Sequence, residues 1–100
     1  MLYAILFEDD PNRADERAKH MAAHLGFLEA NAAVIQAAGP LKDAKDGAAA
    51  GGLWLVEAES AEAAEALVEK DPFWPTGLRK SVRVLAWTQV FASGRRQVPA

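Results

Sequence analysis

Short apolar runs alternate along the chain with polar or small-residue segments. Residues 2–9, LYAILFED, are apolar at both odd and even positions, which is typical of a strand that is buried on both faces and central in a sheet. Three further runs have a strand-like composition, at residues 32–41, 53–59 and 81–92. The pattern therefore predicts four strands.

Two segments between these runs have helical periodicity. Residues 12–30 form the first, with either Asp10 or Asn12 as its N-cap. Its predicted buried stripe has i, i+4, i+7 spacing and consists of Ala14, Ala18, Met21, Leu25 and Leu28. Residues 60–70 form the second helix, with Ser60 as N-cap and many strong helix formers after it.

The order of these elements predicts a ferredoxin-like α+β fold, βαββαβ, in a single domain that spans residues 1–100. Both helices then cover one face of a four-stranded antiparallel sheet. Residues 42–52 are small and polar, so we expect a mobile loop there. From about residue 93 to residue 100 we expect a frayed polar tail.

The face of the sheet away from the helices is also expected to be apolar. In the third predicted strand, Leu53 and Leu55 lie on one face, and Trp54 and Val56 lie on the other. A sheet that is apolar on both sides, with helices on only one, needs a cover on the second side. We therefore predict a homodimer whose sheets pack face to face. The alternative is a monomer whose open face is merely apolar and wet.

Composition narrows the classes of function. The formal net charge of −3 argues against nucleic acid as the main partner, because phosphate binding needs a basic surface. No apolar run approaches the roughly 20 residues that cross a bilayer, and the first residues lack the basic region of a signal peptide, so no membrane association is expected. Cysteine is absent, which excludes thiolate catalysis and agrees with a cytoplasmic location.

Both histidines of the chain, His20 and His24, fall in the first predicted helix. On a helical wheel with Met21 at zero, His24 lies about 60° away, on the shoulder of the buried stripe, and His20 lies about 100° away and faces outward. A histidine on such a border suits a general base, because imidazole titrates near neutrality. The alternatives are a structural histidine, and a metal pair that would lack both the glutamate of an HExxH motif and a third histidine.

Three other residues are candidates for the same site. Asp71 follows the second helix and precedes the rigid Pro72, so it either orients a histidine at the rim of a pocket or only opens a turn. Trp74 is suited to line a pocket for a flat organic ligand, or else it belongs to the core. Arg17 lies beside His24 on the helical wheel and offers a positive charge.

Five stretches, in order, resemble the YCII-related (YciI-like) family: MLYAILFEDD, HLGFLEA, QAAGPLKD, AESAEAAEALVEKDPF and GLRKSVRVLAW. The resemblance covers nearly the whole chain and implies a dimeric α+β barrel. It also implies an active site formed by His24, at the family's His-Leu position, and Asp71, at its Asp-Pro position. Many members carry an arginine about a turn before the histidine, where this chain has Met21, so Arg17 is the candidate that supplies a positive charge instead.

We therefore predict a small, cofactor-independent enzyme that binds a compact organic molecule and needs no metal. His24 is the predicted general base or acid, Asp71 orients it, and Arg17 and Trp74 contact the substrate. The resemblance implies lyase- or isomerase-like proton transfer, since a minority branch of the family resembles lyases that eliminate HCl from chlorinated, hydroxylated aromatics. The alternative is a non-catalytic dimeric module for small-molecule binding or an accessory role, in which His24 and Asp71 are structural.

Overall fold

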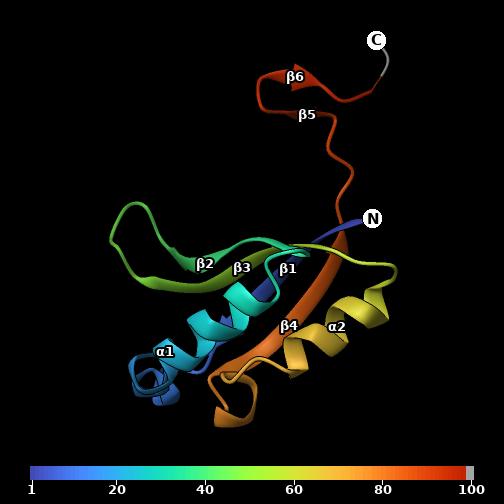
Figure 1. Ribbon diagram of the computed structural model, residues 1–100. Coiled ribbons are helices and arrows are strands. Elements are labelled where there is room, and N and C mark those ends of the chain that lie inside the picture. Colours follow the sequence, from blue (N-terminus) through green and yellow to red (C-terminus); the bar gives the residue numbers. More distant parts are fainter. Residues whose placement is uncertain (99–100) are drawn as a thin grey trace.

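The computed structural model describes residues 1–98, and its elements follow the predicted order. One antiparallel sheet contains β1 (Leu2–Asp9), β2 (Ile35–Lys42), β3 (Ala49–Glu57) and β4 (Arg79–Ala86), in the order β2-β3-β1-β4. Helices α1 (Asp15–Ala30) and α2 (Ala61–Glu69) both lie on one side of this sheet (Figure 1). The predicted ferredoxin-like α+β fold is confirmed.

The central strand β1 carries the middle of the core. It pairs with β3 on one side and β4 on the other, so that Ile5 lies between Trp54 and Val84. Alternate residues of the sheet point toward the helices and form one buried cluster with Ala64 and Val68 of α2. The sheet residues of this cluster are Tyr3, Ile5, Phe7, Ile35, Trp54 and Val56. Leu53 and Leu55 lie on the opposite face and are half-buried, as the alternation in this strand predicts.

Side-chain caps begin a 3₁₀ helix and α2, whereas Ala14, at the start of α1, makes no capping hydrogen bond with its side chain. Asp10, one of the two predicted caps, accepts a hydrogen bond from the backbone N–H of Asn12 (2.9 Å) and starts a short 3₁₀ helix, Pro11–Arg13, ahead of α1. Ser60 accepts from the backbone N–H of Ala63 (3.1 Å) and caps α2 as predicted.

Within residues 1–98, neither helix is long and apolar enough to cross a membrane.

The buried face of α1 differs from the predicted stripe. Three of the five predicted stripe residues are exposed: Ala14, Ala18 and Leu25. His24 is instead the one fully buried residue of this helix, flanked on the same face by half-buried Arg17 and Phe27. The sequence of α1 is only weakly amphipathic, so contacts of His24 with the sheet and with the turn after α2 decide the orientation of the helix.

Two expected irregular segments contain strands. Residues 42–52 were expected as a mobile loop, but only residues 43–48 form a turn, because β2 extends to Lys42 and β3 begins at Ala49. The N–H of Asp43 donates to the carbonyl of Ala48 (2.8 Å) across this turn. Cross-strand pairing here overrides a composition poor in strand formers. The last predicted strand ends at Ala86, and a small hairpin follows, formed by β5 (Phe91–Ala92) and β6 (Arg95–Arg96). The predicted frayed tail therefore includes β6, and its residues 99–100 lie outside the described part.

Gly51 lies where β3 passes close to β1, and no side chain fits there. Its φ is +88°, and a Cβ at this position would meet the carbonyl oxygen of Phe7 at 1.8 Å. We expect Gly51→Ala to lower the free energy of unfolding by about 3 kcal/mol or more, because backbone strain and a steric clash add.

Gly47→Ala is the matched control for urea denaturation. Gly47 also has a positive φ, +74°, but no atom lies within 4 Å of a Cβ built there. Its substitution should therefore cost only the backbone strain, about 1–2 kcal/mol. Equal losses in the two variants would contradict the close approach of β3 to β1.

Candidate active site

A buried hydrogen bond joins His24 of α1 to Asp71, which follows α2. His24 Nδ1 and Asp71 Oδ1 are 2.8 Å apart, although the residues are separated by 47 positions in the sequence. The two side chains are only 7% and 3% exposed. Since a carboxylate oxygen accepts, the Nδ1–H of His24 donates, and Nε2 is the ring nitrogen that stays available for proton transfer.

The local sequence Asp-Pro-Phe positions the carboxylate. Asp71 ends the last turn of α2, where its N–H donates to the carbonyl of Val68 (3.1 Å), and Pro72 cannot continue the helix. Asp71 Oδ1 also accepts from the backbone N–H of Phe73 (3.2 Å). Asp71 therefore opens the turn and also accepts a hydrogen bond from His24, so it does more than open a turn.

Aromatic rings fix the plane of the imidazole. The ring of Phe73 stacks on His24, with a centroid distance of 4.1 Å and an interplanar angle of 20°. The indole of Trp54 lies on the sheet at 6.2 Å from the same imidazole. Together with the bond to Asp71, these contacts leave His24 little freedom to rotate.

Two arginines share one carboxylate next to this pair. Arg17 Nη2 donates to Asp9 Oδ2 (2.5 Å), and Arg79 Nη1 donates to Asp9 Oδ1 (3.0 Å). Burial lowers the pKa of Arg79, and its hydrogen bond to Asp9 acts in the opposite direction. Arg79 is absent from the sequence-based candidates, because one arginine at the start of a strand carries no distinguishing signal.

A small cavity of about 90 Å³ lies between α1, the β2–β3 edge and Arg79. It is lined by Arg17, Met21, His24, Leu25, Leu28, Ala38, Gly39, Pro40, Trp54 and Arg79. The structure thus brings three charged or titratable groups to one hollow, namely His24, Arg17 and Arg79. Trp74 does not line this cavity. It lines a separate hollow, with Glu65, Val68, Glu69 and Val82.

The two histidines have different surroundings. His20 Nε2 lies 3.0 Å from Glu16 Oε2, one helical turn away, and its side chain is 42% exposed, so the outward position predicted for His20 is confirmed. Among residues 1–98, no three side chains of the types His, Cys, Asp and Glu gather in a group that would hold a metal ion. His20 pairs with Glu16 and His24 pairs with Asp71, so the two histidines do not form one site, and the buried His24 is the single candidate base.

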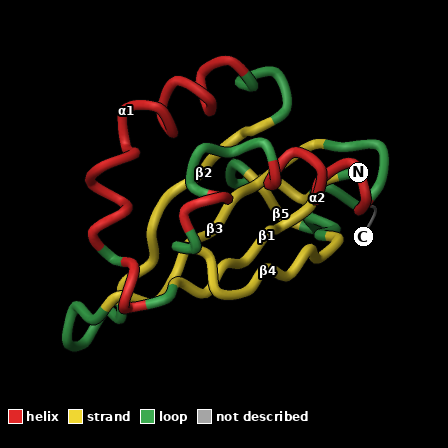
Figure 2. The backbone as a smooth tube through the Cα atoms, turned by 90° about the horizontal axis from the view of Figure 1, so that it is seen from below, coloured by secondary structure: helices red, strands yellow, loops and turns green. Residues whose placement is uncertain are grey.

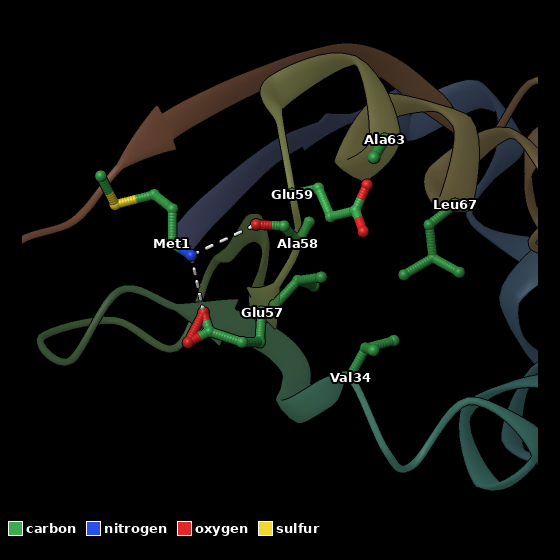
Figure 3. Close-up of a pocket in the computed structure, with 8 residues that line it drawn as sticks. Met1, Val34, Glu57, Ala58, Glu59, Ala63 and Leu67 are labelled. Atoms are coloured by element: carbon green, nitrogen blue, oxygen red, sulfur yellow. Dashed lines mark hydrogen bonds and ion pairs between the residues drawn. The ribbon is translucent and has the colours of Figure 1, made fainter.

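A larger hollow, of about 560 Å³, lies at another part of the fold (Figure 3). It is lined by Met1, Val34, Val56, Glu57, Ala58, Glu59, Ala63 and Leu67. The amino group of Met1 pairs with Glu57 Oε2 (3.3 Å) and donates to the carbonyl of Ala58 (3.3 Å). No histidine or arginine lines this hollow, so its larger volume does not make it the candidate active site.

Comparison with known proteins gives a family and a solved structure. The YCII-related domain family matches residues 1–88. The solved structure of 5-chloro-2-hydroxyhydroquinone dehydrochlorinase (TftG) from Burkholderia phenoliruptrix AC1100, in complex with 2,5-dihydroxybenzoquinone, is 36% identical in sequence, with a TM-score of 0.77. The likeness covers 88% of this chain and 94% of that chain. No curated protein sequence matches the chain.

The bond between His24 and Asp71 should contribute measurably to stability. In a double-mutant cycle of His24→Ala and Asp71→Ala, we expect a coupling energy of about 1.5–3 kcal/mol. Asp71→Ala leaves the buried Nδ1–H of His24 without its acceptor, and His24→Ala leaves the buried carboxylate with the N–H of Phe73 alone as donor within residues 1–98. The pair of His20 and Glu16, one turn apart on α1 and partly exposed, is the matched control, and its coupling should stay below about 0.5 kcal/mol. Urea denaturation measures both cycles, and additive effects at His24 and Asp71 would contradict the buried pairing.

Proposed function

The chain belongs to the YCII-related domain family, and we propose that it is an enzyme in which His24 and Asp71 act as an acid–base pair on a small organic molecule. The observation that carries this proposal is the buried 2.8 Å hydrogen bond that holds His24 in the wall of a cavity. The likeness to a dehydrochlorinase supports a small-molecule enzymatic role. His24 is then the catalytic residue and Asp71 a positioning residue, which fixes the tautomer of the imidazole.

We propose a lyase reaction, the elimination of HCl from a chlorinated, hydroxylated ring. His24 Nε2 first moves a proton from a ring hydroxyl to the chlorine-bearing carbon, which breaks aromaticity and leaves a carbonyl where that hydroxyl stood. His24 then removes the proton of a second hydroxyl, whose oxygen becomes a carbonyl. The freed electron pair shifts through the intervening ring double bond, and the carbon–chlorine bond breaks as chloride leaves. The net change is the loss of one proton and one chloride ion.

This elimination is redox-neutral overall, because the electron pair that leaves with chloride comes from the ring itself. Side chains therefore suffice for the proposed reaction, and we propose that it proceeds without a cofactor. We further propose that the enzyme works in the cytoplasm, in line with the complete absence of cysteine.

Activity should depend on His24 and not on its neighbour His20. With 5-chloro-2-hydroxyhydroquinone as the test substrate, we expect His24→Ala to lower the rate of chloride release by about 10²–10⁴-fold, the usual contribution of a general base. His20→Ala is the matched control, since His20 lies on the exposed side of the same helix, and it should keep the rate of the unmodified protein. A folded His24→Ala protein that releases chloride at the unmodified rate would contradict the proposal.

We also propose that the chain forms a homodimer through its sheets. The sheet face away from the helices is apolar and only half-buried at Leu6, Leu53 and Leu55. The C-terminal hairpin rises on this same side in Figure 1 and overlaps the sheet when viewed along the perpendicular direction in Figure 2. Its Phe91 is 62% exposed. A second copy on the open sheet face would cover these apolar side chains together.

The dimer proposal is tested by the mass in solution. Light scattering after size-exclusion chromatography should give about twice the 10.7 kDa of one chain. Leu55→Lys should convert the dimer to a monomer, because it places a charge in the middle of the proposed interface. Lys45→Glu, in the exposed turn between β2 and β3, is the control and should leave the mass unchanged. A monomeric unmodified protein would contradict the proposal.

A further inference from the structure

The C-terminal hairpin lies apart from the helices and the main sheet (Figure 1). Its strands β5 and β6 have two residues each and are joined by Ser93 and Gly94, whose φ angles of +52° and +74° are typical of a type I′ turn. Within residues 1–98, the hydrogen bonds of the hairpin join its residues only to one another. A two-stranded hairpin alone is at best marginally stable in water, so this one needs a surface to pack against.

One face of the hairpin combines an aromatic ring with a cation. Phe91 pairs with Arg96 across the two strands, so their side chains share one face, whereas Ala92 and Arg95 share the other. Phe91 is 62% exposed, and neither arginine forms an ion pair within residues 1–98. Aromatic residues and arginine are enriched in protein interfaces, so this face has the chemistry of an anchor for another protein surface.

The hollow of about 560 Å³ in Figure 3 has the complementary chemistry. Val56 and Leu67 contribute to its apolar lining, and Glu57 and Glu59 contribute carboxylates. Glu57 pairs with the amino group of Met1 (3.3 Å), whereas Glu59 has no ion-pair partner in the described part of the chain. The hollow therefore fits a partner that presents an apolar side chain next to a cation.

We propose that the hairpin docks into this hollow on a second copy of the chain, with Phe91 in its apolar part and Arg96 paired with Glu59. The inference rests on the proposed homodimer, because it names the part of the second copy that covers the hairpin. The hairpin rises on the sheet face away from the helices, whereas residues of α2 line the hollow, so the two do not meet within one chain. Each hairpin then enters the hollow of the other copy, as two-fold symmetry requires.

The charge of Arg96 favours the hollow over the open face of the sheet. On that face Arg83 is exposed and pairs in register with Leu6, so it would repel a second arginine. Glu8 lies on the same face, and its carboxylate already accepts a hydrogen bond from Ser81 (2.7 Å). The hollow instead offers an acid without a cationic partner beside an apolar surface.

Charge reversal tests the pair of Arg96 and Glu59 through the dissociation constant of the dimer, measured by analytical ultracentrifugation over a dilution series. Arg96→Glu and Glu59→Arg should each raise this constant about tenfold or more, because each dimer contains the pair twice. The variant with both changes should return to within about threefold of the unmodified protein. Arg95→Glu is the matched control, since it makes the same charge change on the other face of the hairpin, and it should raise the constant by less than about threefold.

Photo-crosslinking identifies the surface that Phe91 contacts. With p-benzoylphenylalanine in place of Phe91, irradiation should give a product of twice the 10.7 kDa of one chain on a denaturing gel. Mass spectrometry should find the new bond within residues 56–67 of the second copy, which line the hollow. The same photoreactive residue in place of Lys45, in the exposed turn between β2 and β3, is the control and should not reach these residues.

The inference is overturned if the photoreactive residue at position 91 joins its own chain, the open sheet face of the second copy, or no protein at all. It is also overturned if the two charge reversals do not compensate each other. A dimer by light scattering with either of these results would support the proposed homodimer and contradict docking in the hollow, whereas a monomeric protein would contradict both. Chloride release tests the proposed reaction separately, because none of these variants changes His24 or Asp71.

Discussion

The bond between His24 and Asp71 is the interaction on which the rest of this site depends. It joins α1 to the turn after α2, two elements that the chain places 47 residues apart. A buried carboxylate and a buried imidazole are costly alone, because each loses its hydration on burial. Paired with each other, and with Phe73 stacked on the ring, they fix the orientation of α1 and leave Nε2 as the nitrogen that does not bond to Asp71.

The sheet supplies the second part of the arrangement. Asp9 ends β1 and Arg79 begins β4, so the pairing of these strands brings one acid and one cation together beneath α1. Arg17 reaches the same acid from the helix. The candidate site therefore lies where helix, sheet and turn meet, and a change in any of the three would move His24 relative to Arg17 and Arg79. The fixed positions of these side chains follow from contacts between elements rather than from any one element.

The strand and helix order was predictable because apolar runs, N-caps and prolines act locally. The identity of His24 and Asp71 as a pair followed from the family resemblance, and the structure places them in contact. The buried face of α1 was not predictable from periodicity, since His24, a polar residue, replaces the expected Leu25 on that face. Arg79 was missed for a related reason. Its burial depends on the pairing of β4 with β1 and on Phe7 and Phe73, which only the folded chain brings together.

The tautomer of His24 is the most direct test of the claim that this histidine is an acid–base group oriented by Asp71. Long-range ¹H–¹⁵N spectra of the histidine side chains at pH 8 report which ring nitrogen carries the proton. We predict a proton on Nδ1 of His24, an unprotonated Nε2, and a change in the Nε2 signal when 2,5-dihydroxybenzoquinone is added. A proton on Nε2, with Nδ1 unprotonated, would contradict the account, because no base would then face the cavity.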